Sequence, residues 1–406
     1  MKTQPDFAGD FVIEPERYEL HAAPVYNFNV TRRRFFKLLG GGVVIVALVH
    51  SVAAQESGRR GGGRGGGNRP REISAWLHIA EDGTITAFTG KAEVGQNIRT
   101  TLTQIIAEEL RVPVSAIRLV MADTALVPYD AGTFSSRSTP DMVPQLRRVA
   151  AAARESLIDL AAEQQKAERD VFTIAGAKIK NTKTGETFGF GQITKGQKFM
   201  KTVADNPPMT NHTQWKITGT SVPKVDGGDF VSGKHQFATD VKLPGMLHGK
   251  IVRRPVQGAK LVSLDGKGAE ALPGVKVIHD GEFAGVVAPD TLQAERAVKA
   301  LRAEWSGGSS ASDVQLFDQL KRGAKLTTEA KPEPGENGAQ KLSATYTIAY
   351  IAHAPLEPRA AVAEWKDGKL TVWTGTQRAF GVKAELMQAF GLADDKVRVI
   401  DRKSVV

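Results

Sequence analysis

An arginine pair followed by a short apolar run limits which part of this chain can fold as a domain. Arg32 and Arg33 precede the apolar residues 38–52, three of the first five of which are glycine, and small residues occupy 51–54. Because roughly 20 strongly apolar residues are needed to cross a bilayer, the run is too short for an ordinary membrane helix. The pattern is typical of a twin-arginine (Tat) export signal, with an uncleaved anchor as the alternative. We therefore expect residues 1–54 to be a signal region and the protein to be periplasmic, or membrane-associated if the leader is retained.

The distribution of charge argues against nucleic-acid binding. The formal net charge is +10, but half of it lies within residues 1–71. The Gly/Arg-rich residues 55–71 cannot bury enough apolar surface to fold, so we interpret them as a flexible linker. No basic helix or interleaved aromatic pattern follows, and no nucleic acid is expected as a partner.

The chain contains no cysteine. This excludes disulfides, cysteine-ligated zinc, iron–sulfur clusters and a thiol nucleophile within this polypeptide. The eight histidines show neither HxH nor HExxH spacing, so the sequence predicts no metal held by protein ligands. Any redox relay must therefore lie on another polypeptide.

The first folded module is predicted at residues 72–215. Alternation of apolar and polar residues predicts a β-hairpin at 73–89, and a strand is expected at 117–122. Apolar residues at helical spacing predict helices at 98–110 and 142–163. A hairpin, helix, strand and helix in this order are typical of an α/β unit.

Two more modules are expected after the first. Residues 216–306 are assigned to a second α/β module, which closes with a helix at 292–302, and residues 307–338, rich in Gly, Ser, Pro and Glu, to a linker. Residues 339–400 are assigned to a third module. Its predicted elements are a strand at 344–349, a hairpin at 361–373, a helix at 383–390 and a strand at 397–400. We expect Lys383 and Glu385 on the solvated face of the 383–390 helix.

Two loops in the first module place small residues at helix starts. Gly95, Gln96 and Asn97 precede the first helix, and the loop 132–139, with its several hydroxyls, precedes the second. Backbone N–H groups and the positive end of the helix dipole at such positions favour phosphate. The two loops together could bind a pyrophosphate, although glycine and serine at these positions are also ordinary capping residues.

At these loops the sequence resembles the molybdopterin-binding large subunit of the xanthine dehydrogenase family, in particular its exported branch that contains the isoquinoline 1-oxidoreductase beta subunit. The resemblance rests on Glu93-Val94-Gly95-Gln96, Ala122-Asp123-Thr124, Gly132-Thr133 and Ser135-Ser136-Arg137-Ser138-Thr139. It implies that Gly95, Gln96, Ser136 and Ser138 bind the pterin dinucleotide cofactor. Asn97 replaces the glycine usual at its position.

The resemblance extends through the later modules. The second module resembles the family's α/β hammerhead domain through residues 240–248 and 272–275, and residues 353–363 and 374–378 resemble the start of the main molybdopterin-binding domain. The implied fold class is mixed α/β and multidomain, with the hammerhead domain flanked by parts of the molybdopterin-binding domain. For His353 and Glu357, a place on the active-site floor and a structural role, as a buried ion pair or a capping contact, are equally open, and no catalytic residue is assigned.

The resemblance also implies an activity and partners. The complete protein would be a molybdopterin-dependent oxidoreductase that hydroxylates an isoquinoline-like N-heterocycle or an aldehyde with oxygen from water. Its cofactor would be molybdenum–molybdopterin in the cytosine dinucleotide form. Electrons would pass to a small 2Fe–2S subunit on a separate chain and then to a cytochrome c. The twin-arginine translocase would be a further partner.

The family's catalytic glutamate has no counterpart in this sequence, and residues 401–406 match nothing in the family. Since a general base must lie within hydrogen-bond reach of the proton it takes, we expect this stretch to be an N-terminal fragment that is inactive alone. Two alternatives stay open. One is an exported molybdopterin-type aldehyde dehydrogenase, and the other is a non-catalytic periplasmic binding or scaffold protein.

Overall fold

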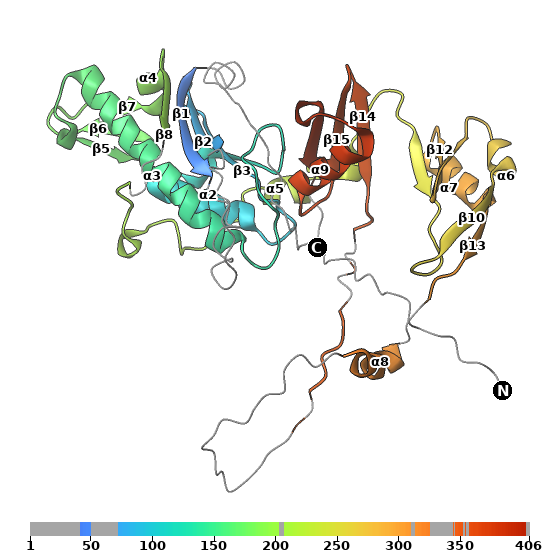
Figure 1. Cartoon of the computed structure of the whole chain (residues 1–406). Coiled ribbons are helices and arrows are strands. Elements are labelled where there is room, and N and C mark those ends of the chain that lie inside the picture. Colours follow the sequence, from blue (N-terminus) through green and yellow to red (C-terminus); the bar gives the residue numbers. More distant parts are fainter. Residues whose placement is uncertain are drawn as a thin grey trace, which may run out of the picture. The chain divides into compact units, whose positions relative to one another are not determined.

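The computed structural model shows two compact units (Figure 1). Unit 1 comprises residues 1–241 and 355–406, and unit 2 comprises residues 242–354. Within the chain the structure describes residues 41–49, 72–202, 207–309, 313–324, 344, 346–351, 354 and 357–402. Arg32, Arg33, His353 and the 55–71 linker lie outside these ranges.

The centre of unit 1 is a five-stranded sheet with the order β4-β3-β2-β1-β8. β1 pairs antiparallel with β2 and parallel with β8, β2 forms a hairpin with β3, and β3 pairs parallel with β4. The strands are β1 (Gly42–Val49), β2 (Glu72–Ala80), β3 (Ile85–Thr89), β4 (Ile117–Met121) and β8 (Lys198–Thr202). The predicted hairpin and the strand after it are therefore confirmed.

Residues 42–49, part of the apolar run expected to belong to an export leader, form β1, an internal strand of this sheet (Figure 1). Val43 and Ile45 are completely buried in the core of unit 1. A short continuous apolar run is typical of a buried strand, and it is also how a leader appears in sequence. A leader cleaved after residue 54 would remove this strand, so the position of β1 disagrees with a signal region that ends at 54. Export itself stays a prediction.

Two helices build the core beside the sheet (Figure 1). α2 (Ile98–Leu110) has the predicted bounds, and α3 (Ser138–Gln165) is longer than the predicted 142–163. α3 begins earlier because Pro140 lies in its first turn, where a missing N–H costs nothing. Both helices end at residues in the left-handed conformation, Arg111 and Lys166, whose N–H groups donate to the last carbonyls. Among the described residues no helix is long and apolar enough to cross a bilayer.

A smaller antiparallel sheet follows α3. It consists of β5 (Phe172–Ala175), β6 (Lys178–Asn181) and β7 (Thr187–Gly189), and the short helix α4 (Phe190–Thr194) comes directly after it. Ile174, Ile179, Phe190 and Ile193 join the main core. The sequence shows little periodicity here, since strands of three or four residues leave too short a pattern.

Unit 1 contains the same ββαβ arrangement twice. The second copy consists of β14 (Ala361–Lys366), β15 (Lys369–Thr374), α9 (Ala379–Phe390) and β16 (Val397–Asp401). β14 and β15 form a hairpin and β16 pairs parallel with β15, as β4 does with β3. The two hairpins turn at Asp82-Gly83 and Asp367-Gly368, and their second strands end in Thr89-Gly90 and Thr374-Gly375.

The second copy docks on the segment that follows β4, and it is therefore part of unit 1 and not the separate third module expected from sequence. The backbones pair where Thr124 N donates to Val399 O at 3.0 Å and Asp401 N donates to Ala122 O at 3.0 Å. The Asp123 carboxylate accepts from Arg398 Nε at 2.9 Å, and this pairing raises the pKa of Arg398.

Two expectations for this region were wrong. Lys383 is buried, with its Nζ 2.7 Å from Asp394 Oδ1, because the helix packs this side against the rest of unit 1; Glu385 is exposed as expected. The strand predicted at 344–349 is absent from the described residues of that stretch, and Tyr346 and Ile348 are almost fully exposed. An alternating pattern without a neighbouring strand to pair with does not form a sheet.

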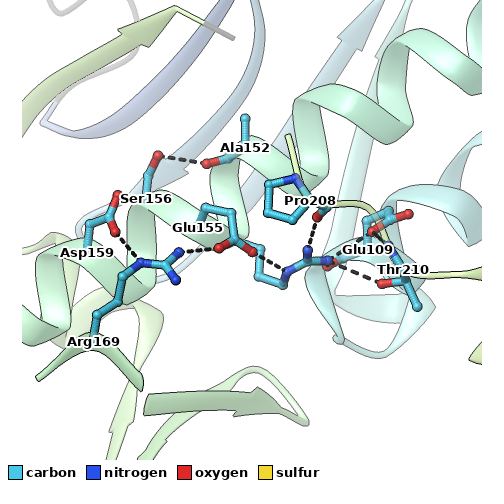
Figure 2. A network of polar contacts seen from close by, with 9 residues as sticks. Glu109, Ala152, Glu155, Ser156, Asp159, Arg169, Pro208 and Thr210 are labelled. Carbon is cyan, nitrogen blue, oxygen red and sulfur yellow. Dashed lines mark hydrogen bonds and ion pairs between the residues drawn. The ribbon is translucent and has the colours of Figure 1, made fainter. Parts of the chain in front are cut away.

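Buried charges hold residues 207–220 against α2 and α3 (Figure 2). The Glu109 carboxylate, completely buried, accepts from Arg147 Nε at 2.7 Å, Arg154 Nη1 at 2.9 Å and Thr210 N at 2.9 Å. Arg154 also donates to Pro208 O. The neighbouring Glu108 accepts from three successive backbone N–H groups, those of residues 216–218.

These contacts place the end of the first module later than the predicted residue 215. Residues 216–241, assigned from sequence to the second module, belong to unit 1, which also contains the short helix α5 (Gly227–Val231). Unit 2 is α/β, with sheets β11-β12-β9 and β10-β13. Its elements are β9 (His248–Ile251), β10 (Lys260–Asp265), α6 (Lys267–Glu270), β11 (Lys276–Asp280), β12 (Phe283–Ala288), α7 (Thr291–Ala300), β13 (Arg302–Ser306) and α8 (Leu316–Gly323).

Candidate cofactor-binding loops

The turn before α2 is organised around one buried carboxylate. Glu93 is 1% exposed, and its Oε1 accepts from Gly95 N at 2.9 Å and Asn97 N at 3.1 Å. Its Oε2 accepts from Arg99 N at 2.9 Å. The positive end of α2, which we expected to attract phosphate, is therefore already occupied by an anion of the protein itself.

The tip of this turn is exposed. Gln96 folds back on its own loop, where its Oε1 accepts from Val94 N at 2.7 Å and its Nε2 donates to Ala92 O at 3.2 Å. No described residue accepts a hydrogen bond from the Gln96 backbone N–H. Asn97 has φ 65°, a left-handed conformation that Asn tolerates better than most residues, which explains how it replaces glycine there.

The second loop is fixed at its base. Asp130 Oδ1 accepts from Gly132 N at 2.8 Å, and Lys91 Nζ donates to Gly132 O at 2.7 Å while lying 3.0 Å from Asp130 Oδ1. Burial raises the pKa of Asp130, against the opposing effect of the Lys91 ammonium. Gly132 has φ 146°, and a Cβ there would lie 2.4 Å from Cε1 of Phe134, so only glycine is tolerated.

The outer part of the second loop presents free polar groups at the start of α3. Ser135 and Ser136 have φ 55° and 54°, and such left-handed residues cost roughly 1–2 kcal/mol each. No described residue forms a hydrogen bond with the hydroxyls of Ser136 or Ser138, or accepts one from the N–H of Ser138 or Thr139. In contrast to α2, the start of α3 therefore keeps donors for a bound anion.

The structure joins the bases of the two loops. Ala92 N donates to Thr133 Oγ1 at 2.8 Å, and Thr133 N donates to Gln377 O at 2.9 Å in the segment before α9. In the same segment Thr376 N donates to Asp401 Oδ1 at 3.0 Å, and burial raises the pKa of Asp401 to about 7. The segments 91–97, 130–139 and 375–378 thus meet within unit 1.

Glu357 and the possible metal ligands add little to the two loops. Glu357 is half-buried and lies close enough to Asp401 to raise the pKa of that carboxyl further. The described ranges contain no cluster of three or more His, Asp or Glu side chains arranged to hold a metal ion.

Comparison with known proteins identifies the family. The profile of a molybdopterin cofactor-binding domain matches residues 27–239, and the profile of a second such domain matches residues 320–404. The chain belongs to the molybdopterin cofactor-binding family. Both candidate loops lie within the first match, and the segment before α9 lies within the second.

Several relatives of this molybdopterin-binding chain are known. A nicotinate dehydrogenase subunit of Pseudomonas putida is 30% identical over 347 residues, covering 82% of this chain and 29% of the relative. The beta subunit of isoquinoline 1-oxidoreductase of Brevundimonas diminuta is 21% identical over 384 residues, covering 80% and 49%. The aldehyde oxidoreductase molybdenum-binding subunit PaoC of Escherichia coli K12 is 26% identical over 237 residues, covering 50% and 32%. The chain spans less than half the length of each of these relatives.

The loops fit a molybdopterin cofactor with a phosphate end. Ser136, Ser138 and the first N–H groups of α3 are hydrogen-bond donors that no described residue uses. The buried charges beneath them, those of Lys91, Glu93 and Asp130, are not evident from the sequence, because charged residues in a loop ordinarily face water. One signal was available: a glutamate near a helix start often accepts from the N–H groups there.

Proposed function

We propose that this chain is part of the large subunit of a molybdenum hydroxylase and that its two loops hold the phosphate end of the cofactor. The observation that carries the proposal is the start of α3, where two serine hydroxyls and two backbone N–H groups have no acceptor among the described residues and lie within the family match. Such groups donate hydrogen bonds to phosphate oxygens. We assign the contacts to Ser136 and Ser138, with Gly95 and Gln96 approaching the same ligand from the first loop.

The cofactor, when bound, supplies the two-electron chemistry by which an N-heterocycle or an aldehyde is hydroxylated with oxygen from water. The chain's own residues bind and orient it. The Gln96 backbone N–H, at the exposed tip of its turn, is a further donor for the same ligand. We propose the cytosine dinucleotide form of the pterin, since a dinucleotide brings the pyrophosphate that such donors would bind.

The substrate is proposed to be an N-heterocycle, with an aldehyde as the second candidate. Two relatives are named for nicotinate and isoquinoline, and a third for aldehydes. We further propose a separate 2Fe–2S subunit as the electron acceptor, with a cytochrome c beyond it, because this chain has no cysteine to bind a cluster. The names of the nicotinate and isoquinoline relatives describe each as one subunit of its enzyme, which is consistent with an assembly of several chains.

Export to the periplasm is proposed separately, on the arginine pair at residues 32 and 33. Because residues 42–49 form β1, the exported protein would retain this segment as part of the folded domain. Intact-mass measurement of the chain from the periplasmic fraction tests this. A mass that includes residues 42–49 agrees with the proposal, whereas a folded chain that begins after residue 54 contradicts it.

The test of the loops is a measurement of cofactor content. The polypeptide that carries this sequence is purified from a host that makes molybdopterin, as the wild type and as the double variant Ser136→Ala/Ser138→Ala. We expect the double variant to lose about tenfold or more of its molybdopterin and to keep its melting temperature. Ser309→Ala, an exposed change in unit 2, is the control. An unchanged cofactor content in the double variant would refute the assignment.

A further inference from the structure

Three consecutive residues, Lys91, Ala92 and Glu93, connect the two candidate loops. Lys91 and Glu93 are 5% and 1% exposed, although they lie in a loop and carry charges. Buried charges are rare unless each is paired and hydrogen-bonded, so their partners show what they do. The Lys91 side chain bonds to the second loop, and the Glu93 side chain bonds to the first.

Lys91 controls the backbone of the second loop. Its ammonium donates to Gly132 O at 2.7 Å, and its partner Asp130 accepts from Gly132 N at 2.8 Å. The ion pair thus binds both polar groups of one residue, the one whose φ of 146° excludes a side chain. Ala92 adds a bond from its N–H to Thr133 Oγ1 at 2.8 Å.

Glu93 controls the first loop. Its two oxygens accept from alternate residues, Gly95, Asn97 and Arg99, across the entry to α2. Gly95 has φ 106° and Asn97 φ 65°, so the turn takes an unusual path that this carboxylate stabilises. The Lys91–Asp130 ion pair and the Glu93 carboxylate thus each bind one loop. A buried ion pair is often no more stabilising than apolar residues of similar size, but it favours one arrangement of the groups around it.

We propose that Lys91 and Glu93 are positioning residues, which fix the backbones of the two loops in the conformation that binds the phosphate end of the cofactor. This inference rests on the proposed function. It assigns the anion-binding role to the start of α3, since Glu93 already fills the start of α2. Neither side chain touches the ligand, and each acts through the backbone of a loop.

The test compares the wild type with Lys91→Met/Asp130→Leu, which replaces the ion pair with apolar residues, with Glu93→Gln and with Lys91→Arg. Amide hydrogen exchange is measured on the cofactor-free chain, and molybdopterin content on the chain from a producing host. We expect Lys91→Met/Asp130→Leu to stay folded, with a lower melting temperature because Gly132 N and Gly132 O lose their partners. Exchange at Gly132 and Thr133 should rise, and molybdopterin should fall about ten- to a hundredfold. Glu93→Gln should act in the same way at residues 95–99. Lys91→Arg, which keeps the positive charge, should retain much of the wild-type molybdopterin content.

Lys299→Met removes an exposed lysine that pairs with Glu295 in unit 2, and as a control it should change neither readout. Wild-type cofactor levels and unchanged exchange in the loop variants would overturn the inference while the proposed function stands. A wild-type chain that contains no molybdopterin would instead overturn the proposed function, and the exchange data would still decide whether these residues fix the loops.

Discussion

The buried carboxylate of Glu109 gives the sharpest stability prediction (Figure 2). Glu109→Gln keeps the shape of the side chain but places an NH2 group where a carboxylate oxygen now accepts hydrogen bonds. Arg154, only 5% exposed, would keep Glu155 at 3.0 Å from its Nε but lose the Glu109 carboxylate 2.9 Å from its Nη1. Arg147 would lose the same carboxylate, and Thr210 N would lose its acceptor. Breaking a buried ion pair costs about 3–5 kcal/mol, because one charge is left uncompensated. At about 2–4 °C per kcal/mol, the melting temperature should fall by roughly 6–20 °C.

The assay is thermal unfolding followed by circular dichroism, with limited proteolysis of residues 207–220 as a local readout. The matched control is Asp159→Asn in the same network, where Asp159 and its partner Arg169 are each about half exposed. An exposed ion pair contributes about 0–1 kcal/mol, so this change should lower the melting temperature by no more than a few degrees. Equal shifts for the two variants would refute the reasoning that burial decides the cost.

Two further predictions concern unit 1. Ile45→Ala in β1 should destabilise the chain by about 2–5 kcal/mol in denaturant titrations, because this side chain is completely buried, and a loss below about 0.5 kcal/mol would contradict an internal strand. Burial raises the pKa of Asp401 in the folded state to about 7, compared with about 3.8 in the unfolded chain. The stability that this protonated carboxyl contributes is therefore complete below pH 3.8 and is lost as the pH rises through 7. Between pH 4 and 8 the melting temperature should therefore fall less steeply with rising pH for Asp401→Asn than for the wild type. Identical slopes would contradict the raised pKa of Asp401.

Local signals predicted much of the fold. The Asp-Gly turns identified both hairpins, and the apolar periodicity gave α2 its bounds of 98–110, since these features depend on residues near one another in the chain. β1 was missed because its position depends on pairing with β2 and β8, while its own residues are equally suited to a leader. The docking of β16 beside residues 122–124 was missed for the same reason, as it joins segments some 275 residues apart.

The site was predicted in part. Sequence located both loops, and the structure brings their bases together through Ala92 and Thr133. Sequence could not show that Glu93 fills the start of α2, or that Lys91 and Asp130 are buried beneath Gly132, because the burial of Lys91 depends on a loop 41 positions away. The roles of Gly95, Gln96, Ser136 and Ser138 as cofactor ligands stay predictions.

The most direct measurement is a crystal structure of the complete, cofactor-loaded polypeptide. We expect phosphate oxygens of the cofactor about 3 Å from the hydroxyls of Ser136 and Ser138 and from the first N–H groups of α3, with Glu93 still bound to the turn before α2. A cofactor whose phosphates lie away from the start of α3, or that displaces Glu93 to bind at the start of α2, would contradict it.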